Sequence, residues 1–115
     1  MTVSARLKGF RVSPNKARLV ADQIRGKGVD EALKILDLSP KRFARTLAKL
    51  LRSAVANAEQ KNERDKAGID LDNLVVGQIA VDQGPNNWRI RARAQGRASW
   101  INHRTSHVRV VLSEE

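Results

Sequence analysis

Apolar and polar positions near the start of the chain alternate with a period of two. Val3, Ala5 and Leu7 alternate with polar residues over TVSARLK, which predicts a strand with one polar face. Two later runs, NLVVGQIAVDQGP at 73–85 and TSHVRVVLSEE at 105–115, have the same β pattern. We expect three strands, the last two of which are suited to pair antiparallel.

Three stretches between the first two strands instead have apolar residues at helical spacing. The first helix is predicted to begin with Ser13 as N-cap and Pro14 at its first position, and to end at Gly26 and Gly28. A second, short helix is predicted over VDEALKILDL. The third, the main core helix, is predicted over residues 39–62 from a second Ser-Pro start, followed by a charged connection to residue 70.

A basic stripe is predicted on the outer face of the third helix. It consists of Lys41, Arg45, Lys49 and Arg52, which fall within roughly 80° of one another at 3.6 residues per turn. Such a stripe is equally typical of an ordinary solvated helix face, so it does not by itself indicate a binding site.

The connection between the last two strands is unusually long and basic. Residues 84–107, GPNNWRIRARAQGRASWINHRTSH, hold both tryptophans, both histidines and five arginines, and no acid occurs from residue 83 to residue 113. Alternate positions place arginines on one face and small apolar groups on the other, which predicts a two-stranded ribbon at about residues 83–104, called here the arm. Its reach of roughly 30 Å exceeds what the rest of the chain can cover, so we expect the arm to protrude and to be mobile when free. The alternative is a disordered basic loop whose tryptophans pack onto the rest of the protein.

Composition narrows the functional classes. The chain has 115 residues, a net charge of +10 and a pI near 11.1, which indicates one domain with an anionic partner, nucleic acid first. It has no cysteine, which excludes disulfides and thiolate metal sites. No apolar run of about 20 residues and no signal-like start are present, so we expect a soluble, intracellular protein, with a basic transit-type start as the alternative.

Catalytic and metal sites find little support. His103 and His107 are four residues apart but lie in a predicted strand, without the glutamate of a zinc-protease motif. RGKG lacks the spacing of a phosphate-binding loop. We therefore expect no enzyme, metal or cofactor. Among the remaining classes are a free basic module acting on RNA or DNA and a membrane-surface protein, although the basic helix face lacks bulky apolar residues for insertion.

Several motifs taken in order carry a family resemblance. SPNKARLVADQIRGKGVDEAL, SAVANAEQ, VDQGP, GRA and RTSHVRVV resemble the bacterial family of the twenty-second large-subunit ribosomal protein, over nearly the whole chain. The resemblance implies an α+β fold, in which three helices pack on a small three-stranded antiparallel sheet and a long β-hairpin arm protrudes. It also implies a cytoplasmic ribosomal protein that binds large-subunit RNA. The arm would thread into that RNA, and its tip would line the polypeptide exit tunnel.

The resemblance and the charge pattern together give the candidate residues. The expected RNA-binding residues are Arg6, Lys8, Ser13, Lys16, Arg18, Arg25, Arg89, Arg91, Arg93, Arg97, Trp100, His103, Arg104, Thr105, Ser106 and His107. The expected tunnel-lining tip consists of Trp88, Arg91, Arg93, Gln95, Gly96 and Arg97. Neighbouring large-subunit proteins and the nascent polypeptide are the other implied partners, with no membrane and no homo-oligomer. The family commonly has a proline in the arm, a cation at position 95 and basic residues at 100 and 103, from which this chain departs.

Overall fold

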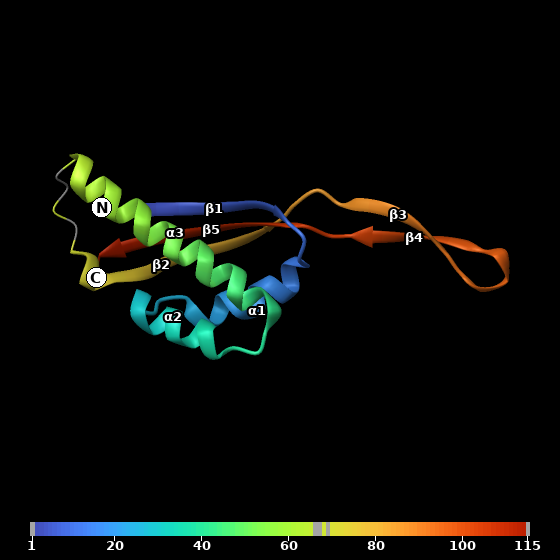
Figure 1. Ribbon diagram of the computed structural model, residues 1–115, viewed down its shortest axis with the longest axis horizontal. Helices are drawn as coiled ribbons and strands as arrows, with labels where there is room; N and C mark the ends of the chain where they lie inside the picture. The colour runs from blue at the N-terminus through green and yellow to red at the C-terminus, as the bar shows by residue number, and fades with distance from the viewer. Residues whose placement is uncertain (1, 66–67, 69, 115) are drawn as a thin grey trace.

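A computed structural model of the protein describes residues 2–65, 68 and 70–114. Its main part is built on a three-stranded antiparallel sheet (Figure 1). The strand order is β1 (Thr2–Phe10), β5 (Ser106–Glu114) and β2 (Leu74–Gln83). The predicted antiparallel pairing of the last two predicted strands is therefore confirmed as β2 against β5. We call this sheet and its helices the body.

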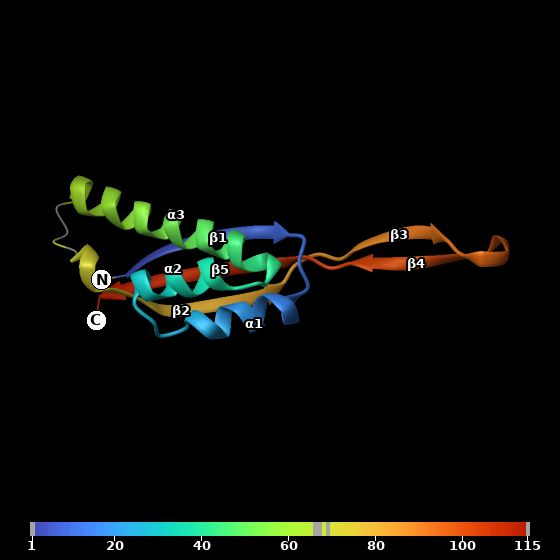
Figure 2. The same ribbon diagram turned by 60° about the horizontal axis from the view of Figure 1, so that its bottom comes forward.

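Three helices cover one face of the sheet (Figure 2). They are α1 (Pro14–Ile24), α2 (Val29–Leu38) and α3 (Arg42–Asp65), and a short 3₁₀ turn, η1 (Leu71–Asn73), leads into β2. The long α3 lies along β1 and β5, whereas α1 and α2 lie beside β2. The predicted α+β class, with three helices on a small antiparallel sheet, is confirmed.

The period-two pattern of β1 and β5 places most of their apolar residues in one layer, and in β2 a bulge between Val76 and Gln78 brings Val76 onto the same face as Ile79 and Val81. Val3 lies opposite Leu112 and Ala5 opposite Val110 in the register of β1 and β5, and all four side chains are buried. The helices supply the other layer of the core, with Leu51 of α3 fully buried. Burial of each large aliphatic side chain stabilises the fold by roughly 1.5–3 kcal/mol.

Two predicted helix ends were wrong. The main helix begins at Arg42 and not at Ser39, because the residue before Pro40 is held extended and Ser39 instead terminates α2. Lys41 therefore precedes the helix that carries the other three residues of the basic stripe, and its N–H donates to the Ser39 hydroxyl at 3.2 Å. The same helix continues to Asp65 through the first half of the predicted charged connection, whose Lys, Glu and Arg residues are good helix formers. Positions 66, 67 and 69 of that connection lie outside the described residues.

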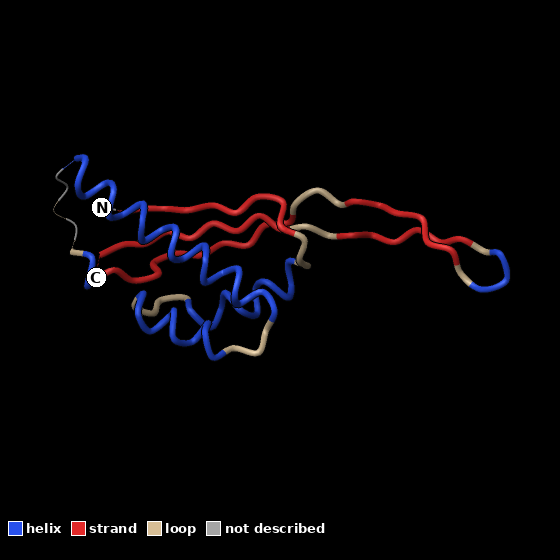
Figure 3. Tube along the Cα trace, in the orientation of Figure 1, coloured by secondary structure: helices blue, strands red, loops and turns tan. Residues whose placement is uncertain are grey.

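A separate two-stranded sheet extends from one end of the body (Figure 3). It consists of β3 (Asn87–Ala92) paired antiparallel with β4 (Ala98–His103), joined by a short turn, η2 (Ala94–Gly96). The longest dimension of the molecule is 65 Å and its radius of gyration 17.4 Å, compared with about 13 Å for a compact chain of this length. The arm therefore projects away from the body.

Candidate nucleic-acid interface

The two faces of the arm have different chemistry. In the register of β3 and β4, Arg89 lies opposite Ile101 and Arg91 opposite Ser99, so the arginines share one face. The other face carries three large apolar side chains, Trp88 (54% exposed), Ile90 (63%) and Trp100 (65%). The body contacts the arm only near its root, where Arg11 lies against His103, so both faces are open to a partner along the rest of the arm.

The tip of the arm interrupts this alternation. Gln95 and Gly96 both have positive φ, 62° and 71°, as the two central residues of a type I′ turn do. The Arg93 N–H donates to the Arg97 carbonyl at 2.6 Å, and the Arg93 Nε donates to the Ser99 hydroxyl at 2.8 Å. The alternation along β3 ends at Arg93, because the chain reverses direction at Gln95 and Gly96.

No arginine of the arm takes part in an ion pair with a described residue. The ion pairs of the described chain are Arg25–Asp22, Arg52–Asp37 and Arg64–Asp65, all in the body. The acid-free stretch from residue 83 to residue 113 explains this difference, because it leaves the arm without nearby carboxylates. The guanidinium groups of the arm are thus free to bind phosphate bidentately.

Two hydroxyls at the root of the arm serve the fold. Thr105 Oγ1 donates to the Pro85 carbonyl at 2.7 Å, and Ser106 Oγ donates to the Val12 carbonyl, also at 2.7 Å. Both residues are buried. RNA binding by these two residues stays a prediction. The sequence alone could not show that their hydroxyls also hold neighbouring loops together.

The two histidines connect the arm and the final strand to the end of β1. The Gly9 N–H donates to His107 Nδ1 at 2.8 Å, and Arg11 Nη2 lies 2.7 Å from His103 Nδ1. Within the described residues, no group of three or more histidine, cysteine or acidic residues is arranged to hold a metal ion. Sequence reasoning did not select Arg11, although its position between a strand and a helix beside other cations was a visible signal.

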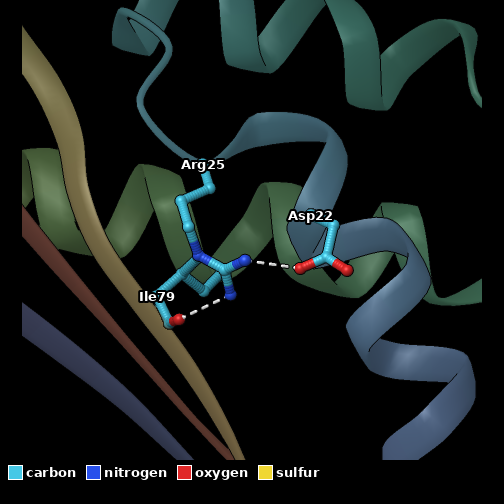
Figure 4. Close-up of polar contacts among 3 residues, drawn as sticks. All are labelled: Asp22, Arg25 and Ile79. Carbon is cyan, nitrogen blue, oxygen red and sulfur yellow. Dashed lines mark hydrogen bonds and ion pairs between the residues drawn. The ribbon is translucent and has the colours of Figure 1, made fainter.

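The arginines of α1 and its C-terminal end contact the adjacent strand. Arg18 donates to the Val81 carbonyl and Arg25 to the Ile79 carbonyl, each at 3.0 Å. Figure 4 shows Arg25 between Asp22 and Ile79, where it fixes the end of α1 to β2. For both arginines, RNA binding stays a prediction, and it requires the part of each guanidinium that these bonds leave open.

The sheet face opposite the helices is also basic. Arg6 of β1 lies directly opposite Arg109 of β5, and both side chains are exposed. With Lys8 and His107 they border a hollow of about 480 Å³ that Asp82 also lines. Sequence reasoning missed Arg109, although it stands on the polar side of the alternation in the last strand.

The remaining candidates are distributed along α1 and the arm. Lys16 is exposed on α1, and Arg104 is exposed just after β4. Ser13 occupies the N-cap position of α1 as predicted, but its side chain makes no capping hydrogen bond. Arg97 lies exposed beside the tip. The structure thus gathers most candidates along the arm and around its root, whereas Arg6 and Arg25 lie farther along the sheet.

Comparison with known proteins identifies the family. The sequence model of the family described as ribosomal protein L22p/L17e matches residues 5–113. The chain belongs to the L22p/L17e family of ribosomal proteins. It is also 50% identical over 115 residues to the large ribosomal subunit protein uL22 of Desulforamulus reducens, covering 100% of this chain and 97% of that protein.

Membership of the L22p/L17e family settles the functional class. The protein is a structural ribosomal protein of the large subunit and not an enzyme, and in bacteria such a protein is part of the cytoplasmic ribosome. Among the described residues, no helix combines the length and the apolar character needed to cross a bilayer.

Proposed function

We propose that the arm and the basic surface around its root bind large-subunit ribosomal RNA. The observation that carries the proposal is an exposed arm whose arginines have no carboxylate partner among the described residues. Two-stranded hairpins are marginally stable alone, and this one buries little apolar surface. RNA on both faces would supply the missing contacts, with phosphates at the arginines and unpaired bases stacked on the tryptophans.

A salt titration tests this role of the arginines. Replacing Arg89, Arg91 and Arg93 with alanine should flatten the dependence of RNA affinity on salt, by about 0.7–0.9 in logarithmic slope for each phosphate that the variant no longer neutralises. The matched control is alanine at Arg45, Lys49 and Arg52 on α3, which removes the same charge from a surface outside the arm. An equal change of slope in both triple variants would refute a special role for the arm. Tighter binding to duplex DNA than to ribosomal RNA would favour a free nucleic-acid module.

The tip of the arm is proposed to line the polypeptide exit tunnel. The proposal is supported by the family resemblance, which implies a tunnel-lining arm, and by the tip residues Gln95 and Gly96, which lie exposed at the end of the arm, farthest from the body. A photo-crosslinking residue in place of Gln95 should then capture a stalled nascent chain in assembled ribosomes. The same residue in place of Leu38, exposed on α2, should capture none. Equal capture at both positions, or none at Gln95, would contradict the placement.

A further inference from the structure

A cavity of about 600 Å³ lies where the arm joins the body. Three parts of the chain that are distant in sequence line it: residues 11–20 around the start of α1, residues 41–43 at the start of α3, and residues 102–104 at the end of β4. Its volume falls in the range of about 300–1,000 Å³ that is typical of small-molecule sites. The cavity therefore has room for a ligand larger than a simple anion.

The lining of this cavity is cationic. Aspartate and glutamate do not occur among its lining residues. Its basic side chains form no ion pair with a described residue. These basic side chains are those of Arg11, Lys16, Lys41, Arg42 and Arg104. A negatively charged group in the cavity would neutralise charges that the protein itself leaves unpaired.

The lining is also apolar on one side. Leu19 of α1 is 58% exposed at the cavity, whereas Phe43 and Val20 behind it belong to the buried core. A helical leucine left open beside a cation cluster gives a ligand both an apolar surface and a charged one. A bare phosphate would leave this apolar side uncovered.

One polar atom at the cavity lacks a partner. Asn102 Oδ1 is buried and accepts no hydrogen bond. Buried acceptors are almost always satisfied, so rotation of the Asn102 side chain toward a ligand with an N–H donor would satisfy this one. The neighbouring Ser13 hydroxyl is also unused by the helix that it precedes.

We propose that this cavity holds a single nucleotide of RNA that is turned out of its stack. The phosphate lies among the cations and the base lies on Leu19. An N–H of the base edge donates to Asn102 Oδ1, which the side chain turns toward the base. Unstacked nucleotides are the elements of RNA that proteins recognise through such contacts. The inference rests on the proposed RNA-binding function and adds a pocket for one nucleotide at the root of the arm.

The test is an NMR titration of the isotope-labelled full chain with adenosine monophosphate, inorganic phosphate and adenosine in parallel. Adenosine monophosphate should shift the amides of residues 11–20, 41–43 and 102–104 and should bind about tenfold more tightly than phosphate or adenosine. Leu19→Glu should weaken its binding by about tenfold or more. Leu38→Glu makes the same change at the exposed leucine of α2 and should leave the affinity for adenosine monophosphate within about twofold of the unsubstituted protein.

The outcomes separate this inference from the proposed function. Equal affinity for phosphate and the nucleotide would overturn the pocket in favour of a simple anion site, and absence of shifts at the lining residues would overturn it outright. Binding of the chain to large-subunit RNA is measured in the same buffer. If the RNA binds and the nucleotide does not, only the inference fails. If the RNA does not bind, the proposed function fails, and the pocket fails with it.

Discussion

The body and the arm differ in how many of their apolar side chains are buried. In the body, all three strands and all three helices turn an apolar side toward a shared core. In the arm, no residue from Asn87 to His103 is buried, and its largest apolar side chains are the exposed Trp88 and Trp100. The arm has the hydrogen bonds of a sheet without the burial that stabilises sheets in water.

This contrast indicates where each region obtains its stability. The body is stabilised by its own apolar contacts, so substitutions there should change the free energy of unfolding. The arm depends on whatever covers its two faces, so substitutions there should change binding instead. Each of the following predictions would break or sharpen this division.

The largest expected difference lies between a core leucine and an arm isoleucine. Leu51→Ala removes a fully buried side chain and should lower the free energy of unfolding by about 2–5 kcal/mol. Ile90→Ala removes a side chain that is 63% exposed and should change it by less than about 0.5 kcal/mol. Urea denaturation of both variants measures the two changes in the free energy of unfolding. A large loss from Ile90→Ala would mean that the arm packs against the body in solution.

A smaller effect is expected at Gly84, where the body ends and the arm begins. A Cβ added here would lie 2.5 Å from Thr105 Oγ1, which already donates to the Pro85 carbonyl. Gly84→Ala should therefore cost about 1–3 kcal/mol in a denaturation experiment. The cost should shrink in a Thr105→Ala background, since the clashing atom is then absent. An unchanged cost would place its origin in the backbone and not in this contact.

The sequence predicted features of the two regions that depend on local patterns better than those that depend on contacts between distant residues. The periods of the apolar residues identify the strands and helices because burial acts on each element locally, and the absence of acids identifies the arm. Helix ends such as Arg42 and Asp65 were missed because a proline and good helix formers shift them by a few residues. Hydroxyl and guanidinium groups look the same in a sequence whether they bind a phosphate or their own backbone, as Thr105 and Arg25 show.

The third prediction concerns like charges on the open sheet face. Arg109 lies opposite Arg6 without an ion-pair partner among the described residues, so Arg109→Thr should raise the free energy of unfolding by about 0.2–1 kcal/mol at low salt. The gain should shrink at high salt, where the repulsion is screened. The control is Arg6→Thr, alone and combined with Arg109→Thr, because the repulsion between this pair can be removed only once. Gains that add up in the double variant would point to strand propensity and not to repulsion.

The smallest effect is expected at the tip, and it should be visible only within the arm. Gln95 adopts a left-handed conformation with φ 62°, which asparagine tolerates better, and Gln95→Asn would create the Asn-Gly pair favoured in type I′ turns. The hairpin should become more stable by about 0.5–1 kcal/mol. The measurement is slower hydrogen exchange of the Arg93 amide, which donates across the turn to the Arg97 carbonyl. Gln95→Val should have the opposite effect, because β-branched residues strongly disfavour this conformation. The midpoint of global unfolding should stay the same in both variants. A shift of that midpoint would show that the arm unfolds together with the body, and the two regions would then have to be treated as one cooperative unit.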